Sequence, residues 1–263
     1  MEEPKNTALV TGASSGIGLA ISGELARRGY SLLMVSNEEA KLAEEAGKLE
    51  AQFGIKATLL YMDLAQRDSA QKIFDYCMTN NFKIDILVNN AGIFFFRDIT
   101  DTQPELIEKI INLHILTPAM LSRLFARQMI ADNRKGYILN MASIASRMMM
   151  PGITLYSSTK SFLRCFSRAM RNEVFNKGVS ITTISPGAVA TTLYNLSSSY
   201  LKLGVRLGII ITTERLAKKA VKKMLRRKAE YIPGGFINRL FILLVAALPE
   251  FLIRKIKKHI PKS

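Results

Sequence analysis

The alternation of short aliphatic or β-branched runs with longer amphipathic segments is the feature that most constrains the fold of this chain. The short runs predict seven strands, at residues 7–11, 31–35, 57–61, 84–89, 136–143, 179–185 and 229–232. Helical patterns lie between them, near residues 17–29, 38–53, 66–80, 104–130, 154–176 and 212–228. Each pattern is long enough for a right-handed crossover. We therefore predict an α/β fold, with a doubly wound, seven-stranded parallel sheet that helices cover on both faces.

Length and composition limit the class of protein. A chain of 263 residues fits one large α/β domain, and 48% hydrophobic with 22% charged residues excludes a disordered chain. Cys77 and Cys165 form no CxxC pair and the two histidines are far apart, so we expect no disulfide, no metal site and a reducing compartment. Residues 1–6 are polar and no apolar run approaches the ~20 residues of a membrane-spanning helix, so we expect a cytoplasmic protein without a cleaved signal.

Positive charge is concentrated near the end of the sequence. The net charge is +16, but residues 201–263 hold 16 basic and 3 acidic residues, which leaves only +3 for the first 200. A cationic tail can face acidic lipids or phosphorylated ligands. We predict no nucleic-acid partner, because no recognition motif and no interleaved stacking aromatics accompany the charge.

A glycine-rich turn follows the first predicted strand, where residues 11–18 read TGASSGIG. Gly12 allows a tight exit from the strand, and Gly16 and Gly18 let the backbone approach a pyrophosphate at a helix N-terminus. The alternative is a glycine-rich turn without a ligand. The strand before the turn and the amphipathic helix after it favour a dinucleotide site.

Further motifs follow the later strands. Residues 89–92 read NNAG after the fourth strand, Ser143 follows the fifth, Tyr156 and Lys160 come thirteen residues later as YxxxK, and Pro186-Gly187 follows the sixth. In this order the motifs resemble the short-chain dehydrogenase/reductase family over nearly the whole chain. The resemblance implies a Rossmann-type NAD(P)-binding catalytic domain at residues 1–232, with a substrate loop at 192–211, and a basic, apolar extension at 233–263.

The residue types at these positions suit carbonyl reduction. Tyr156 and Lys160 lie one helical turn apart, so the ammonium can favour the phenolate form of a phenol whose ordinary pKa is roughly 10. By the resemblance, Tyr156 passes a proton to or from the substrate oxygen, Ser143 holds that oxygen and the nicotinamide carries hydride. The alternatives are a surface tyrosine, a lysine on a solvated helix face and a serine that only caps the strand end.

The resemblance also implies the cofactor site. Asn90 would flank the adenosine, and Asp63 would accept a hydrogen bond from the adenine amine, although it could equally cap the next helix. The predicted cofactor-binding residues are Gly12, Ser14, Ser15, Gly16, Ile17, Gly18, Asn37, Asp63, Leu64, Asn90, Ala91, Gly92, Tyr156, Lys160, Pro186, Gly187, Val189 and Thr191.

One position departs from the family pattern. Where the family has an asparagine that holds a water in a proton relay, this chain has His114, with Asn112 two residues before it. Histidine can also hydrogen-bond a water and adds titration near neutral pH, so His114 is a relay candidate. The alternative is a satisfied buried histidine without a catalytic effect.

The end of the second strand bears on the choice of cofactor. An Asp there would bind the ribose of NAD, whereas Arg or Lys would favour NADP. Asn37 occupies this position, so without a repelling Asp we favour NADP(H), with NAD(H) as the alternative. Ser15 is not basic, and Glu38 and Glu39 add negative charge nearby.

Three apolar segments are expected to wall the substrate: residues 94–96, 148–150 and 192–211. Phenylalanine and methionine side chains suit a lipid-like ligand, although they could equally pack in the core.

The extension at 233–263 combines an apolar run with a cationic end, which is typical of an interfacial segment. A dimer contact or a helix packed over the sheet are its alternatives.

A similar extension occurs in the family branch that contains very-long-chain 3-oxoacyl-CoA reductases, some hydroxysteroid dehydrogenases and 3-ketosphinganine reductases. The basic helix at 215–228 could meet CoA phosphates or lipid headgroups, or be a solvated face.

We expect NADP(H)-dependent reduction of a lipophilic ketone: a 3-oxo lipid such as 3-ketosphinganine, a 3-oxoacyl thioester or a steroid. A non-catalytic dinucleotide-binding protein at the membrane surface and an NAD-dependent hydroxysteroid or alcohol dehydrogenase are the alternatives. We expect a homodimer or homotetramer through the helices at 104–130 and 154–176.

Overall fold

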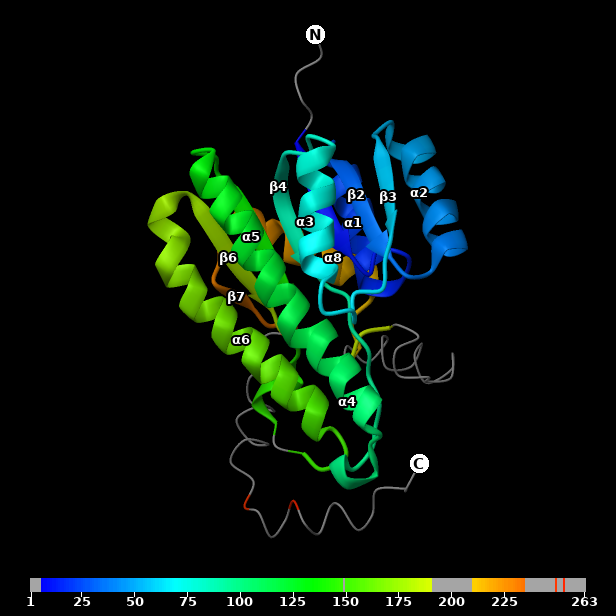
Figure 1. The fold of residues 1–263 in the computed structure, drawn as a ribbon, viewed down its shortest axis with the longest axis vertical. Coiled ribbons are helices and arrows are strands. Elements are labelled where there is room, and N and C mark those ends of the chain that lie inside the picture. The colour runs from blue at the N-terminus through cyan, green and yellow to red at the C-terminus, as the bar shows by residue number, and fades with distance from the viewer. Residues whose placement is uncertain (1–5, 149, 191–209, 235–248, 250–252, 254–263) are drawn as a thin grey trace.

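A computed structural model describes residues 6–148, 150–190, 210–234, 249 and 253 (Figure 1). The predicted positions Met149 and Thr191 lie outside the described residues. So do most of the substrate loop at 192–211 and nearly all of the extension at 233–263. No helix in the described ranges is long and apolar enough to cross a membrane.

The sheet has seven parallel strands in the order β3-β2-β1-β4-β5-β6-β7. The strands are β1 (Thr7–Thr11), β2 (Ser31–Ser36), β3 (Ala57–Tyr61), β4 (Ile84–Asn89), β5 (Gly136–Met141), β6 (Val179–Ile184) and β7 (Glu230–Tyr231). The strand order reverses between β1 and β4, and a crevice opens at such a switch point beyond the carboxyl ends of the strands. The predicted doubly wound sheet is confirmed. β7 has two residues instead of the four expected, because it pairs only with Thr183 and Ile184 of β6.

Helices pack on both faces of the sheet (Figure 1). One face carries α1 (Gly16–Ala26), α2 (Glu39–Phe53) and α8 (Thr213–Leu225), which contribute Ile21, Leu42 and Leu216 to one core cluster. The other carries α3 (Ser69–Thr79), α5 (Thr117–Ala131) and α6 (Thr154–Val174), which contribute Ile73 and Phe125 among others. Because both faces are covered, the strands read as nearly continuous apolar runs.

The helix expected at residues 104–130 contains an irregular turn. α4 (Pro104–Ile111) passes into a π-helical turn, η2 (Asn112–Leu116), and then into α5. Pro118 has no N–H for the carbonyl four residues earlier, so regular α-helical hydrogen bonding cannot continue through this point. The wider turn carries His114 beside the carboxyl ends of the strands.

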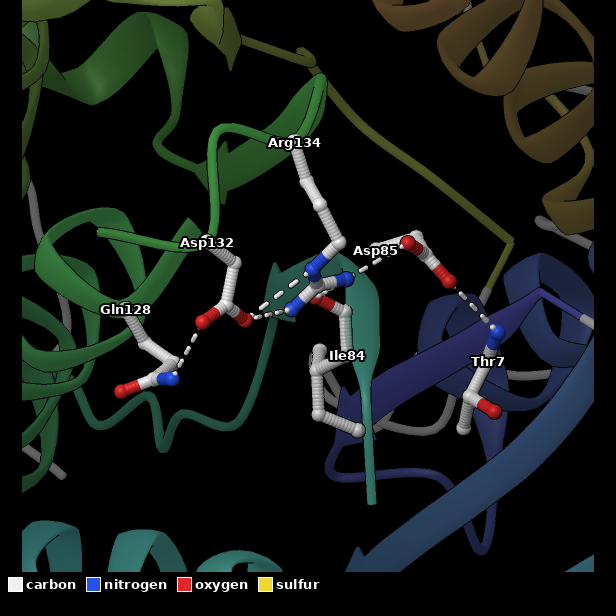
Figure 2. Close-up of polar contacts among 6 residues, drawn as sticks. All are labelled: Thr7, Ile84, Asp85, Gln128, Asp132 and Arg134. Atoms are coloured by element: carbon white, nitrogen blue, oxygen red, sulfur yellow. Dashed lines mark hydrogen bonds and ion pairs between the residues drawn. The ribbon is translucent and has the colours of Figure 1, made fainter. Parts of the chain in front are cut away.

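A polar cluster joins β1, β4 and the end of α5 at the amino ends of the strands (Figure 2). Asp85 accepts the backbone N–H of Thr7 at 3.0 Å and a guanidinium N–H of Arg134 at 2.8 Å. Arg134 also pairs with Asp132, whose carboxylate accepts a hydrogen bond from Gln128. These contacts fix the amino ends of the two central strands, far from the crevice.

Candidate active site

A cleft of about 330 Å³ lies at the carboxyl ends of the strands and brings most of the predicted site residues together. Of the predicted cofactor-binding residues that the structure describes, all but Gly18 line it, and Ser143 and His114 line it too. Residues that the sequence did not single out also line it: Ser36, Met62, Ile93, Lys109, Leu113, Met141 and Ala142. Most of these immediately follow or end a strand, or precede His114, and this position is the signal that could have identified them.

The glycine-rich turn has the shape that a pyrophosphate requires. Gly12 and Gly16 adopt positive φ angles of 65° and 55°, which side-chain-bearing residues rarely adopt. A Cβ on Gly12 would lie 2.9 Å from the Cα of Ala91, so the turn also packs directly against the NNAG segment. Gly18 does not line the cleft, because it faces the carbonyl of Gly12 and lets α1 pack beneath the turn. Its predicted cofactor contact is therefore replaced by a packing role.

Asn90 braces this turn from the side. Its Nδ2 donates to the carbonyls of Thr11 at 3.1 Å and Gly12 at 3.3 Å, and its backbone N–H donates to Thr11 Oγ1. The side-chain amide nitrogen is thus committed to the protein. Asn90 still lines the cleft, so its predicted position beside the cofactor stands together with this structural role.

The Ser-Tyr-Lys set is buried at the inner end of the cleft. Tyr156 is 7% and Lys160 5% exposed, so neither is a solvated surface residue. Lys160 Nζ donates to the carbonyl of Met141 at 3.0 Å and lies 5.7 Å from the centre of the Tyr156 ring. Burial lowers the pKa of Lys160 to about 8.

Ser143 caps a turn and also lines the cleft. It precedes the 3-10 turn η3 (Ile144–Arg147), and its Oγ accepts the N–H of Ala145 at 3.1 Å, so it caps this turn. A serine hydroxyl that accepts one hydrogen bond still has its hydrogen to donate. Because Ser143 also lines the cleft beside Tyr156, it can hold a substrate oxygen there.

His114 is a neutral histidine whose two ring nitrogens are both engaged. Nε2 accepts the N–H of Ile93 at 3.0 Å, and Nδ1 lies 3.0 Å from Thr159 Oγ1. The hydroxyl of Thr159 donates to the carbonyl of Tyr156, so its oxygen accepts from His114 and the ring proton is assigned to Nδ1. Burial, and then the charge of Lys160, hold the pKa of His114 well below its usual value. The ring is therefore that of a satisfied buried histidine, and the proton relay stays a prediction.

The adenosine end of the cleft carries a carboxylate. Glu38 Oε2 accepts a 2.6 Å hydrogen bond from Ser14 Oγ, and Ser36 Oγ donates to Ser14 Oγ at 2.9 Å. Asp63 also lines the cleft, and it accepts the N–H of Ala65 in the turn after β3. It does not cap α3, which begins at Ser69 and has Asp68 at its N-cap position.

Apolar side chains surround Tyr156. Phe94 meets the Tyr156 ring edge-to-face at 5.0 Å between ring centres, and Phe94 and Phe95 pack in a cluster with Ile110 and Tyr156. Phe96 lies against Gly152, where no Cβ would fit. These phenylalanines are half-buried and are not among the described lining residues of the cleft, and their contact with a substrate stays a prediction. Ile93 and Leu113 form the apolar part of the described wall.

The residues of the cleft fit a dinucleotide. The glycine turn opens on the N-terminus of α1, whose free amides and dipole favour a pyrophosphate, and Ser14, Asn37 and Asp63 supply polar groups for an adenosine. Lys160 and Tyr156 close the nicotinamide end. This arrangement can bind a nicotinamide dinucleotide and protonate a carbonyl oxygen beside it.

Comparison with known proteins agrees with this geometry. The sequence profile of the short chain dehydrogenase family matches residues 6–202. The chain is 30% identical to human very-long-chain 3-oxoacyl-CoA reductase over 97% of this chain and 80% of that protein. It is 34% identical to the reductase of the same name from Anas platyrhynchos over 72% of this chain, a match that spans only 62% of the relative. L-sorbose reductase from Gluconobacter frateurii, solved with NADPH and L-sorbose, is 26% identical with a TM-score of 0.77 over 88% of this chain and 95% of that one.

Proposed function

The chain belongs to the short-chain dehydrogenase family and is an NAD(P)-dependent oxidoreductase, and we propose that it reduces a ketone on a lipophilic substrate to the alcohol. A 3-oxoacyl thioester, another 3-oxo lipid such as 3-ketosphinganine, or a steroid ketone are the candidate substrates. The observation that carries the proposal is the meeting of Ser143, Tyr156 and Lys160 in one cleft with the glycine-rich turn.

The side chains divide the chemistry between them. A bound nicotinamide dinucleotide supplies the hydride. Ser143 donates a hydrogen bond to the carbonyl oxygen, which orients the ketone and stabilises the negative charge that develops on it. Tyr156 gives its hydroxyl proton to that oxygen, and the nearby ammonium of Lys160 favours the phenolate that is left.

Two features support a lipophilic substrate. The described wall beside Tyr156 is apolar, with Ile93 and Leu113 next to the Phe94 cluster. Relatives named very-long-chain 3-oxoacyl-CoA reductases align along 97% of this chain in the human case. Lys109 on α4 also lines the cleft, where its ammonium suits an acidic group of the substrate, such as the phosphates of a CoA thioester.

Within NAD(P)(H), we propose that NADP(H) is used and that Glu38 limits its affinity. Asn37 carries no charge that would repel a 2′-phosphate. Glu38, one residue later, does carry such a charge, and Ser14 holds it on the lining of the cleft. The L-sorbose reductase solved with NADPH shows that the family fold accepts this cofactor.

The buried lysine argues against a dinucleotide-binding protein without activity. Lys160 is buried although burial disfavours its ammonium, and its place beside Tyr156 supports a role in proton transfer in addition to its predicted contact with the cofactor. The NAD-dependent hydroxysteroid or alcohol dehydrogenase alternative differs only in cofactor and substrate, so the same assay tests it.

The test is the initial rate of NADPH oxidation, with NADH in parallel, on detergent-dispersed 3-ketosphinganine, a long-chain 3-oxoacyl-CoA and a 3-oxosteroid. Tyr156→Phe serves as the blank, because it removes the proton donor but keeps the ring that packs against Phe94. We expect the variant to lose about 10²-fold or more in kcat and to bind NADPH as the wild type does.

The substrate that gives a fast, tyrosine-dependent rate is the class this enzyme reduces. Retained turnover in Tyr156→Phe would overturn the assignment of the proton donor. Cofactor binding without turnover on all three ketones would overturn the lipophilic substrate class, and comparable rates with short polar ketones would do the same.

A further inference from the structure

A carboxylate on the edge strand β7 connects two segments that wall the cleft. Glu230 accepts hydrogen bonds from Arg147 Nη2, which lies 2.8 Å from both carboxylate oxygens, and from Ser185 Oγ at 2.7 Å. Arg147 ends the turn η3, and Ser185 follows β6 directly before Pro186 of the cleft. The side chains of Arg147 and Glu230 are only 19% and 27% exposed, so solvent screens this pair weakly. Neither is among the described lining residues.

The ion pair holds the far end of the turn that Ser143 begins. Ser143 Oγ accepts the N–H of Ala145 and the carbonyl of Ser143 accepts the N–H of Ser146, each at 3.1 Å. The direction of the serine side chain is therefore bound to the geometry of η3. Arg147 is the next residue of this turn, and its contact with Glu230 anchors that geometry to the sheet.

These contacts close a ring that passes through both walls of the cleft. Ile144 donates its backbone N–H to the carbonyl of Pro186 at 2.9 Å, so the two segments also meet at their cleft ends. Pro186 is bonded to Ser185, whose hydroxyl donates to Glu230. Glu230 in turn leads back to η3 through Arg147. A closed ring of satisfied polar contacts leaves η3 less freedom than a single hydrogen bond would.

The alternative is that the pair only fastens the short strand β7 to the sheet. However, β7 has backbone hydrogen bonds of its own. The N–H of Thr183 donates to the carbonyl of Ala229 at 3.0 Å. That of Ser185 donates to the carbonyl of Tyr231 at 2.9 Å. β7 is therefore held to β6 without the pair, whereas the end of η3 reaches the sheet through Arg147.

We propose that Arg147 and Glu230 are positioning residues, which hold η3 and thereby keep the hydroxyl of Ser143 where it meets the substrate oxygen. The hold on η3 stands on the geometry, whereas the effect on turnover rests on the proposed function. Without the pair, Ser143 keeps its hydroxyl but loses its fixed direction. It then stabilises the charge that develops on the carbonyl oxygen less well, because such stabilisation depends on a donor that is already in place.

The first experiment measures the kinetics of Arg147→Met on the ketone that the wild type reduces with dependence on Tyr156. We expect kcat to fall about 10-fold, with KM for the ketone and Kd for NADPH within about twofold of the wild type. Arg134→Met is the matched control, because it breaks a pair of the same 2.8 Å length with 23% and 22% exposed side chains at the amino ends of the strands. An equal kcat in the two variants would overturn the proposal.

The second experiment asks whether the effect passes through Ser143. In a Ser143→Ala background the hydroxyl is absent, so we expect Arg147→Met to lower kcat no further. Glu230→Gln removes the charge of the other partner at nearly the same volume and should show the same dependence on Ser143. It carries the test if Arg147→Met does not fold. Losses that multiply in the double variants would give the pair a role apart from Ser143 and overturn the proposal.

Amide hydrogen exchange tests the hold on η3 without turnover. We expect the N–H groups of Ala145 and Ser146, which bond to Ser143, to exchange about 10-fold faster in Glu230→Gln and at the wild-type rate in Arg134→Met. Unchanged exchange in Glu230→Gln would overturn the proposal whether or not a ketone is reduced. Faster exchange in a protein that reduces no ketone would support the hold on η3 and count against the proposed function, so the two can fail separately.

Discussion

In the proposed mechanism, Lys160 is the residue on which the acid-base chemistry of the site depends. It is almost fully buried, and burial alone brings its pKa down to about 8. Because burial disfavours the ammonium, the lysine is charged below about pH 8 and neutral above it. The protein thus keeps a cation beside Tyr156 only over a limited pH range.

The pH dependence of reduction follows from this pKa. We expect kcat/KM for ketone reduction to fall as pH rises through about 8, because Lys160 loses the proton that supports the tyrosine. Initial rates across a pH series, with saturation by the cofactor verified at each point, measure the effect. A rate that stays level well above this pH would contradict the assignment. Lys160→Met should lack the pH-dependent activity altogether.

Glu38 is the residue we expect to set the affinity for NADP(H). Its carboxylate lies on the lining of the cleft and accepts a hydrogen bond from Ser14, so a 2′-phosphate would meet a like charge there. Glu38→Gln keeps the shape and removes the charge. We expect the Kd for NADPH to fall about 10-fold, which is about 1.4 kcal/mol, with little change for NADH.

Fluorescence titration of the reduced cofactors measures both constants. Glu39→Gln is the control, because Glu39 begins α2 and does not line the cleft. An equal gain for NADH and NADPH in Glu38→Gln would show that Glu38 does not discriminate at the 2′-position.

At the scale of elements, the carboxyl ends and the amino ends of the strands differ in what they contribute. The carboxyl ends hold the site, and the amino ends are tied by the cluster of Figure 2. There Arg134, after α5, bonds Asp85 of β4, which also accepts from Thr7 of β1. Arg134 and Asp85 are only about a fifth exposed, at 23% and 22%, so solvent screens this pair less than a surface pair.

This division predicts a change in stability without a change in catalysis. Arg134→Met removes the partner of Asp85 and Asp132, and we expect the free energy of unfolding to fall by about 1–2 kcal/mol with kcat unchanged. Urea unfolding measures the loss. Lys72→Met, which breaks the exposed pair with Asp68, should leave the stability unaltered. Equal stability of the two variants would show that the cluster is no more than a surface contact.

At the scale of the whole molecule, the outer face of α6 presents aromatic surface. Phe162 is 38% exposed and stacks on Phe166 with ring centres 5.7 Å apart. Figure 1 shows α5 and α6 side by side on this face of the sheet. The sequence-based expectation of a homo-oligomer through these helices stays a prediction that this surface makes testable.

We expect the wild type to be a dimer or tetramer in light scattering and Phe162→Glu to shift it toward the monomer, because a buried, unpaired carboxylate is costly. Tyr61→Glu, an exposed aromatic position on the edge strand β3 (58% exposed), is the control. A monomeric wild type at assay concentration would refute the expected assembly.

The exposed basic residues of α8 are relevant to which partners the whole molecule can bind. The described residues of this helix and the turn after it carry Arg215, Lys218, Lys219, Lys222, Arg226 and Lys228 at exposed positions, and no ion pair is found for them among the described residues. A solvated face accounts for this arrangement, and contact with phosphates or lipid headgroups stays a prediction.

The sequence by itself determined the seven strands, their alternation with helices and the positions of the Ser143, Tyr156 and Lys160 set. Hydrophobic periodicity and motif spacing are local properties, and they can be followed along the chain without knowing what packs against what. Only the tertiary structure decided what His114, Gly18 and Phe94 contact. Their contacts are with Ile93, Thr159, Gly12 and Tyr156, which reach them from other elements. A hydrogen bond or a cavity is defined by the distance between groups in space, and the fold sets that distance.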